Sequence, residues 1–104
     1  MQKHTKVYFD FFGYDEGSYI ECEMECGSRA VDIHHLLKRS KIGSKQERDY
    51  IENLVGLCRD CHINAESDKC FNMYVKIKHL ENVCVQVYSL IELEKRLKEY
   101  EDRK

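Results

Sequence analysis

The chain has 104 residues, six cysteines, no proline and a formal net charge of -2 at pH 7. This length suits one small domain rather than two, and the near-neutral charge excludes a strongly basic nucleic-acid binder. No apolar run approaches the roughly 20 residues needed to cross a membrane, and residues 1–8 lack the apolar stretch of a signal peptide. We therefore expect a cytoplasmic protein with reduced cysteines, which favour metal binding over disulfides.

The elements expected in the first two thirds of the chain are short. The aromatic and β-branched run at residues 7–12 predicts an N-terminal strand. The others follow in chain order: a turn at 13–18, a strand at 30–36, a polar loop at 40–49, a strand at 53–57, and helix from His62 onward. In the first of these two internal strands, alternation places Asp32 and His34 on one face and Val31 and Ile33 on the other.

The last third of the chain carries two patterns. Residues 71–79 continue a helical pattern, whereas the alternating valines of residues 81–88 favour a strand, with a restarting helix as the alternative. Beyond them an amphipathic stripe with helical spacing predicts a packing face, which is a possible surface for a protein partner: Leu90, Leu93, Leu97 and Tyr100.

Two cysteine pairs bracket a histidine-rich stretch. Four thiolates can close a tetrahedral zinc site, and the spacing predicts one from Cys22, Cys26, Cys58 and Cys61. The first pair is one residue longer than the common knuckle, so the alternative is that one of its members is only a buried thiol. Gly27 suits the tight turn of such a knuckle. Cys70 and Cys84 have no pairing pattern and are expected to be buried thiols.

Two histidines and an asparagine between the pairs, with a third histidine directly after the second pair, form a second group. His34 and His35 are adjacent, so on a strand one ring can bind a metal while the other faces a different partner. Asn53 precedes the second strand, and His62 follows the second cysteine pair directly. Glu66 lies four residues after His62 and shares its helical face.

A locally basic segment lies inside this stretch. Its cations, Lys38, Arg39, Lys41 and Arg48, stand where a phosphate backbone would have to approach. A solvated loop is the alternative explanation of the same charges.

The order of these residues over about 20–68 resembles the HNH (His-Me finger, ββα-metal) endonucleases. The motifs that carry the resemblance are Cys22 and Cys26, the run 31–36, Glu52-Asn53-Leu54, and the run 57–62. The resemblance implies that His34 and His62 bind a divalent metal and that His35 is the general base. It implies that Asn53 holds the loop that orients the base, or binds the metal as in some members. It also places Glu66 where some members have a further ligand, often His.

The sequence thus predicts an α+β protein. We expect a ββα-metal finger with structural zinc knuckles, an N-terminal strand and a C-terminal helical segment, in a single domain over 1–104 with its core at 20–68 and a helical extension at 69–104. The expected activity is hydrolysis of phosphodiester bonds in nucleic acid, DNA before RNA, with structural Zn²⁺ and catalytic Mg²⁺ or Mn²⁺.

Two other functions remain open at this stage. A catalytically inactive zinc-bound adaptor for nucleic acid or protein would keep the same residues. A thiol redox protein using Cys58 and Cys61 ranks lower, because no thioredoxin-like βαβ pattern surrounds them. By analogy with small phage-encoded HNH proteins, a phage or mobile element is one natural source, and the location would then be the host cytoplasm.

Overall fold

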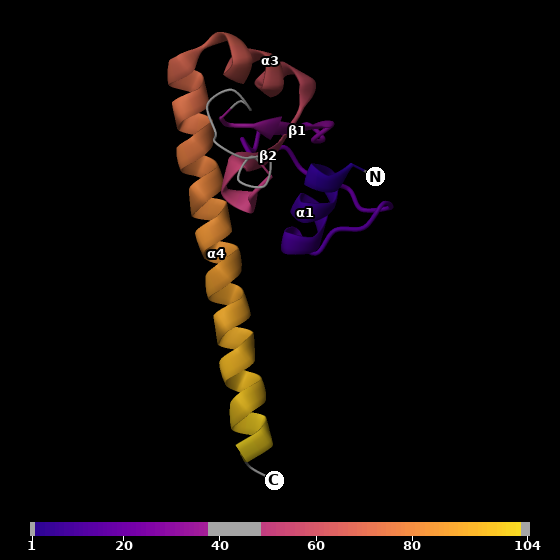
Figure 1. Ribbon diagram of the computed structural model, residues 1–104, viewed down its shortest axis with the longest axis vertical. Coiled ribbons are helices and arrows are strands. Elements are labelled where there is room, and N and C mark those ends of the chain that lie inside the picture. The colour runs from indigo at the N-terminus through magenta and orange to yellow at the C-terminus, as the bar shows by residue number, and fades with distance from the viewer. Residues whose placement is uncertain (1, 38–48, 103–104) are drawn as a thin grey trace.

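The computed structural model describes residues 2–37 and 49–102. Its centre is an antiparallel hairpin of β1 (Asp32–His35) and β2 (Leu54–Leu57), followed by helix α3 (Arg59–Ser67). Helix α1 (Lys3–Phe12) lies against one side of this unit, and the long helix α4 (Lys69–Asp102) runs along another (Figure 1). A short 3-10 helix, η2 (Ile51–Asn53), leads directly into β2. The expected α+β class with a ββα unit is confirmed.

The hairpin fixes which face each histidine occupies. In its register Asp32 pairs with Leu57, His34 with Val55 and His35 with Leu54. Successive strand residues point to opposite faces, so Asp32 and His34 share the side of the sheet covered by α3, and His35 faces the side of α1. All four β2 residues are buried, because this strand packs on both faces.

The expected N-terminal strand is wrong, since residues 3–12 form α1. The aromatic run has high strand propensity, but its burial recurs every three to four residues, as in a helix. Tyr8 is buried, and Thr5, Phe9 and Phe12 are half-buried, whereas Lys6 and Asp10 are exposed. Packing of this stripe against the sheet outweighs local propensity. Gly13 ends the helix in the left-handed conformation, at φ 76°.

The expected strand at 81–88 is also wrong, because α4 is continuous from Lys69 to Asp102. Asp68 begins it by accepting hydrogen bonds from the backbone N–H groups of Cys70 and Phe71. Val75, His79 and Val83 are its buried residues, and their spacing of four is that of one helical face. The alternating valines therefore point to different sides of a helix.

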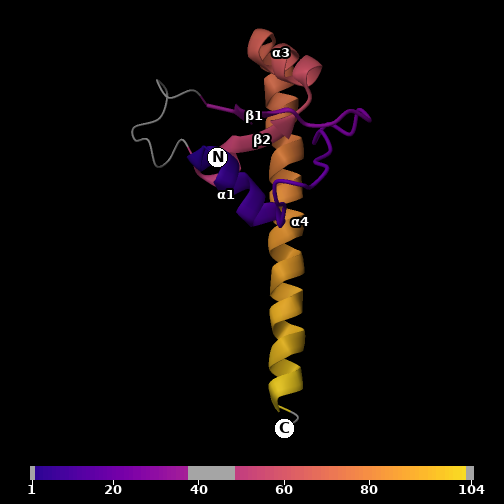
Figure 2. The same ribbon diagram turned by 90° about the vertical axis from the view of Figure 1, so that its right-hand side faces the viewer.

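The second half of α4 extends past the rest of the described chain (Figure 2). The residues of the predicted stripe, Leu90, Leu93, Leu97 and Tyr100, are consequently exposed. Cys70 and Cys84 are exposed on the same helix, so their expected burial is wrong. Among the described residues, none of the helices is both long and apolar enough to span a membrane.

Candidate metal centres and active site

Four cysteine sulfurs converge beside the hairpin. Cys22 and Cys26 come from the loop after α1, and Cys58 and Cys61 lie at the start of α3, where Cys58 is the N-cap. Cys26 Sγ lies 3.6 Å from Cys58 Sγ and 3.9 Å from Cys61 Sγ. Sulfurs bound at about 2.3 Å to one tetrahedral ion would be about 3.8 Å apart. These two spacings match those of a tetrahedral site, and all four sulfurs lie within 4.8 Å of one another, so the cluster could hold a metal ion.

The backbone of the first knuckle accounts for its unusual length. Glu25 and Gly27 both adopt positive φ, at 56° and 86°, and the Cys22 backbone N–H donates to the Ser28 carbonyl at 3.0 Å. The extra residue is absorbed in this double left-handed turn, which brings Cys26 back toward Cys58. Gly27 supplies the unrestricted backbone that the turn requires.

Thiol ionisation in the cluster depends on position. A backbone hydrogen bond from Ser28, followed by one from the Cys58 thiol, lowers the pKa of Cys26 to about 7. Burial raises the pKa of Cys22 and of Cys61. Buried thiols ionise together only when a cation compensates their charge, so this donor set fits a bound metal better than four free thiols.

A second cluster joins β1 to α3. His34, His62 and Glu66 each offer one ligand atom, and these atoms lie within 4.8 Å of one another. His62 Nδ1 lies 3.0 Å from Asp32 Oδ2, and its Nε2 lies 3.1 Å from Glu66 Oε1. A neutral ring would then aim a lone pair at a carboxylate oxygen. The two acceptors repel unless the ring gains a second proton or a cation binds both, so the donor set fits a divalent ion.

Asn72 of α4 sets the tautomer of His34. The Asn72 amide nitrogen donates to the Leu36 carbonyl at 3.3 Å, which turns its Oδ1 toward His34 Nε2 at 2.9 Å. His34 Nε2 must therefore be the donor, and the lone pair stays on Nδ1. Burial lowers the pKa of His34, and this favours the neutral imidazole that binds metals.

His35 lies on the opposite face of β1 and has different partners. Its Nε2 lies 3.1 Å from Asp49 Oδ1, and its ring meets that of His4 edge-on, with centroids 5.0 Å apart. The side chain of His35 is 24% exposed, whereas that of Asp49 is 7% exposed. A carboxylate can only accept here, so Nε2 carries the hydrogen and the Nδ1 lone pair remains available to accept a proton.

Asn53 joins the ends of the two strands. Its Oδ1 accepts the backbone N–H of Leu37 at 2.7 Å and its Nδ2 donates to the Leu37 carbonyl at 3.1 Å. The Asn53 carbonyl also accepts the Leu36 N–H at 3.0 Å. These bonds fix the backbone directly after His34 and His35, which positions both rings.

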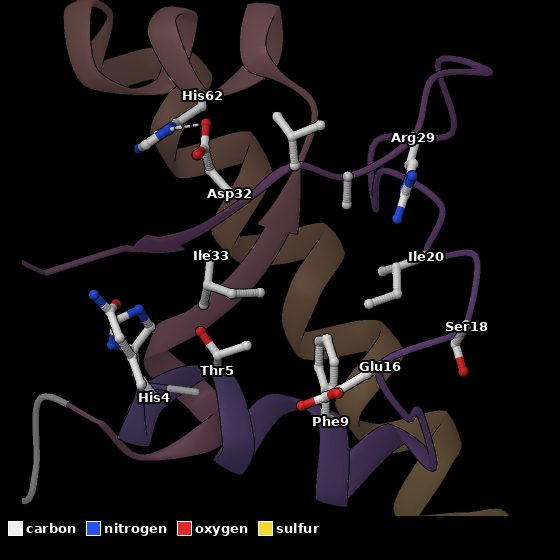
Figure 3. Close-up of a pocket in the computed structure, with 13 residues that line it drawn as sticks. His4, Thr5, Phe9, Glu16, Ser18, Ile20, Arg29, Asp32, Ile33 and His62 are labelled. Atoms are coloured by element: carbon white, nitrogen blue, oxygen red, sulfur yellow. Dashed lines mark hydrogen bonds and ion pairs between the residues drawn. The ribbon is translucent and has the colours of Figure 1, made fainter.

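A cavity of about 490 Å³ lies along β1, and both His62 and His4 line it. Figure 3 shows Asp32 and His62 on one side of the strand, His4 and Thr5 of α1 on the other, and Arg29 and Glu16 farther along. Ile20, Ile33 and Phe9 form its apolar lining. His62 of the second cluster therefore borders a cavity with both charged and apolar walls.

The structure brings together most of the residues singled out in the sequence. Cys22, Cys26, Cys58 and Cys61 form one group, and His34, His62 and Glu66 another. His35 lies on the opposite face of β1 from the second group, and Asn53 holds the backbone that follows both histidines. The proposed backbone contacts Lys38, Arg39, Lys41 and Arg48 lie outside the described residues.

Sequence reasoning missed four residues of this site. Asp32 could have been found, because strand alternation already placed it on the face of His34. His4, Asp49 and Asn72 carry no local signal, since each reaches the site from an element distant in sequence.

Comparison with known proteins gives one match. Residues 21–68 match the family model described as HNH endonuclease. Searches of curated proteins and of solved structures returned no match. The matched segment contains both cysteine pairs, the hairpin and helix α3.

Proposed function

From the HNH endonuclease domain that the chain carries at residues 21–68, we propose that it is a metal-dependent endonuclease that hydrolyses phosphodiester bonds in DNA. The observation that carries the proposal is that the two adjacent histidines of β1 lie on opposite faces of the strand, in different surroundings. His34 joins a cation-binding cluster on one face, and His35 presents a free Nδ1 lone pair on the other. A metal ion that stabilises charge and a general base that activates water each accelerate phosphodiester hydrolysis.

His35 is the proposed general base. Asp49 accepts its Nε2 hydrogen and holds the ring, so Nδ1 takes the proton of the attacking water. A neutral imidazole is suited to this task near neutral pH. Asn53 contributes by fixing the backbone that carries His35, which is a positioning role.

His34, His62 and Glu66 are the proposed holders of a catalytic Mg²⁺ or Mn²⁺ ion. When bound, the ion supplies positive charge for the phosphoryl oxygens and the leaving 3′ oxygen. Asp32 and Asn72 orient the two imidazoles through the ring nitrogens that face away from the ion. Glu66 is 55% exposed, so this side of the cluster is open to a substrate phosphate.

The four-cysteine cluster is the proposed site of a structural Zn²⁺. Thiolate ligands favour zinc over the hard ions that serve the histidine cluster. The zinc would join the loop of Cys22 and Cys26 to the start of α3, and so hold His62 against β1. A protein partner at the exposed stripe of α4 remains a prediction, as does backbone binding by the segment that contains Lys38 and Arg39.

The test is cleavage of supercoiled plasmid by the purified protein with Mg²⁺ or Mn²⁺, beside a His35→Ala variant of equal zinc content. We expect the variant to lose about 10²- to 10⁴-fold in rate, because a general base contributes that much. Added imidazole or higher pH should restore part of the rate. Binding of DNA without cleavage, or equal rates for both proteins, would instead identify a catalytically inactive adaptor.

A further inference from the structure

A third group of metal-binding side chains lies on the α1 side of β1. It consists of His4 from α1, His35 from β1 and Asp49, and one ligand atom from each lies within 4.8 Å of the other two. Figure 3 shows His4 on the opposite side of the strand from His62 and Asp32. The group shares no residue with the four-cysteine cluster or with the cluster of His34, His62 and Glu66.

We propose that His4, His35 and Asp49 form a regulatory site for a zinc-like transition ion that inhibits the nuclease by occupying His35. The binding site stands on the geometry of these three residues alone. Its inhibitory effect rests on the proposed function, because it requires His35 to be the base.

The ligand set determines which ion the site would take. Two imidazoles and one carboxylate are a common three-ligand set for zinc, which leaves a fourth position for water. Imidazole nitrogens favour Zn²⁺ over Mg²⁺, so the ion that supports cleavage would not compete well here. Around a tetrahedral zinc with bonds of about 2.0–2.1 Å, ligand atoms are about 3.3 Å apart. His35 Nε2 and Asp49 Oδ1 are already 3.1 Å apart, and a ring nitrogen of His4 completes the group within 4.8 Å.

The surroundings allow an ion to reach the group. His4 lines the cavity of about 490 Å³ beside β1, and its ring is half-buried like that of His35. Asp49 is 7% exposed, so it offers the ion a carboxylate oxygen that is largely shielded from water. The site thus combines a buried anionic ligand with two accessible imidazoles.

Inhibition follows from the tautomer of His35. In the metal-free protein Nε2 holds the hydrogen and Nδ1 holds the lone pair. A metal bound between Nε2 and Asp49 takes the place of that hydrogen, which moves to Nδ1 while the ring stays neutral. Nδ1 then carries a hydrogen and has no lone pair with which to accept the proton of water.

The first arm of the test measures binding without activity. Wild-type protein and variants are dialysed against low micromolar free Zn²⁺, and bound zinc is measured by elemental analysis. We expect His4→Ala and Asp49→Asn each to bind one zinc fewer than wild type, and the control Thr5→Ala, on the same turn of α1, to match wild type. Equal zinc content in wild type and both site variants would overturn the proposal.

The second arm measures plasmid cleavage in Mg²⁺ with increasing zinc, and each protein is normalised to its own zinc-free rate. The zinc concentration for half inhibition should rise at least about tenfold in His4→Ala, as expected when a metal site is impaired. Equal inhibition of both proteins would place the inhibitory zinc elsewhere and overturn the regulatory role. If the wild-type protein cleaves no plasmid, the proposed nuclease function is refuted. The zinc content measured in the first arm still decides whether the metal site exists.

Discussion

Glu23 and His79, which are 56 residues apart in the chain, form a buried ion pair with 2.8 Å between Glu23 Oε1 and His79 Nδ1. The other ring nitrogen, Nε2, lies 2.7 Å from the Ile51 carbonyl. A carbonyl can only accept, so this nitrogen donates, and the carboxylate receives the second ring hydrogen. The pair therefore ties the first cysteine knuckle to α4 and to η2, which ends at Asn53.

The same carboxylate accepts three further hydrogen bonds. Asn82 Nδ2 donates to Oε1 at 2.9 Å, and the Tyr8 hydroxyl and Gly56 N–H donate to Oε2 at 2.7 and 3.0 Å. Burial, and then the charge of Glu23, raise the pKa of Tyr8, so its hydroxyl stays protonated and keeps donating. One side chain thus connects the knuckle with α1, β2 and α4.

Loss of the Glu23–His79 pair should destabilise the fold strongly. We expect His79→Ala to lower the free energy of unfolding by about 3–5 kcal/mol, because it leaves a buried carboxylate without its counter-charge. Tyr8→Phe, which removes one hydrogen bond to the same carboxylate, should cost only about 1 kcal/mol. Urea unfolding of both variants measures this, and similar losses would show that the charge of His79 is unimportant.

The cysteine cluster should hold one zinc ion per chain. Cys58→Ser should lose the zinc and most of the folded structure, because binding and folding are coupled in small metal domains. Cys84→Ser removes an exposed thiol outside the cluster and is the matched control. Zinc content and circular dichroism are the measurements, and a stably folded wild-type protein without zinc would contradict the prediction.

Asp32 should raise the affinity of the histidine cluster for divalent ions. Replacing it as Asp32→Asn weakens the orientation of His62, and we expect Mn²⁺ affinity to fall by about 10- to 100-fold. His62→Ala should abolish binding at this cluster. Asp32 also pairs with Arg59 at 3.2 Å, so Arg59→Ala is the control that disturbs Asp32 without touching His62. Calorimetric titration with Mn²⁺ distinguishes them, and an equal effect of both changes would argue against the orienting role.

The lowered pKa of His34 has a consequence for stability against pH. The unfolded chain protonates His34 below its ordinary pKa of about 6.5, whereas burial delays protonation in the folded state. The free energy of unfolding should therefore decrease as the pH falls from about 6.5 to the pKa of His34 in the folded state. Above about pH 6.5, His34 should not make the free energy of unfolding depend on pH.

The measurement for His34 is urea unfolding of zinc-loaded protein, without other divalent ions, from about pH 7.5 to about pH 5.5. His34→Gln cannot take up the proton, so it should lose less stability than wild type over this range. Parallel curves for the two proteins would show that the ionisation of His34 does not influence the fold.

The basic segment outside the described residues should contact the nucleic-acid backbone. Neutralising Lys38 and Arg39 together should weaken DNA binding on every sequence alike and reduce the slope of log affinity against log salt by roughly 1.8, at about 0.9 per phosphate. Binding to two unrelated duplexes over a range of salt concentrations measures both. An unchanged slope would mean that these charges are only solvated.

The sequence by itself determined which residues make up the candidate metal-binding groups, because their arrangement depends on local spacing. Two residues between Cys58 and Cys61 place both thiols at one helix start, and strand alternation separates His34 from His35. The i, i+4 spacing of His62 and Glu66 places both on one helical face, whatever the rest of the chain does.

The tertiary structure alone decided the rest, because packing between distant elements overrides weak local preferences. The aromatic run forms helix α1, in which Tyr8 contacts Glu23. The valines of residues 81–88 belong to helix α4, whose His79 contacts the same carboxylate. His4, Asp49 and Asn72 acquire their roles only where α1, the approach to η2 and α4 meet β1. Such contacts depend on the relative placement of whole elements, for which the spacing of residues along the chain contains no signal.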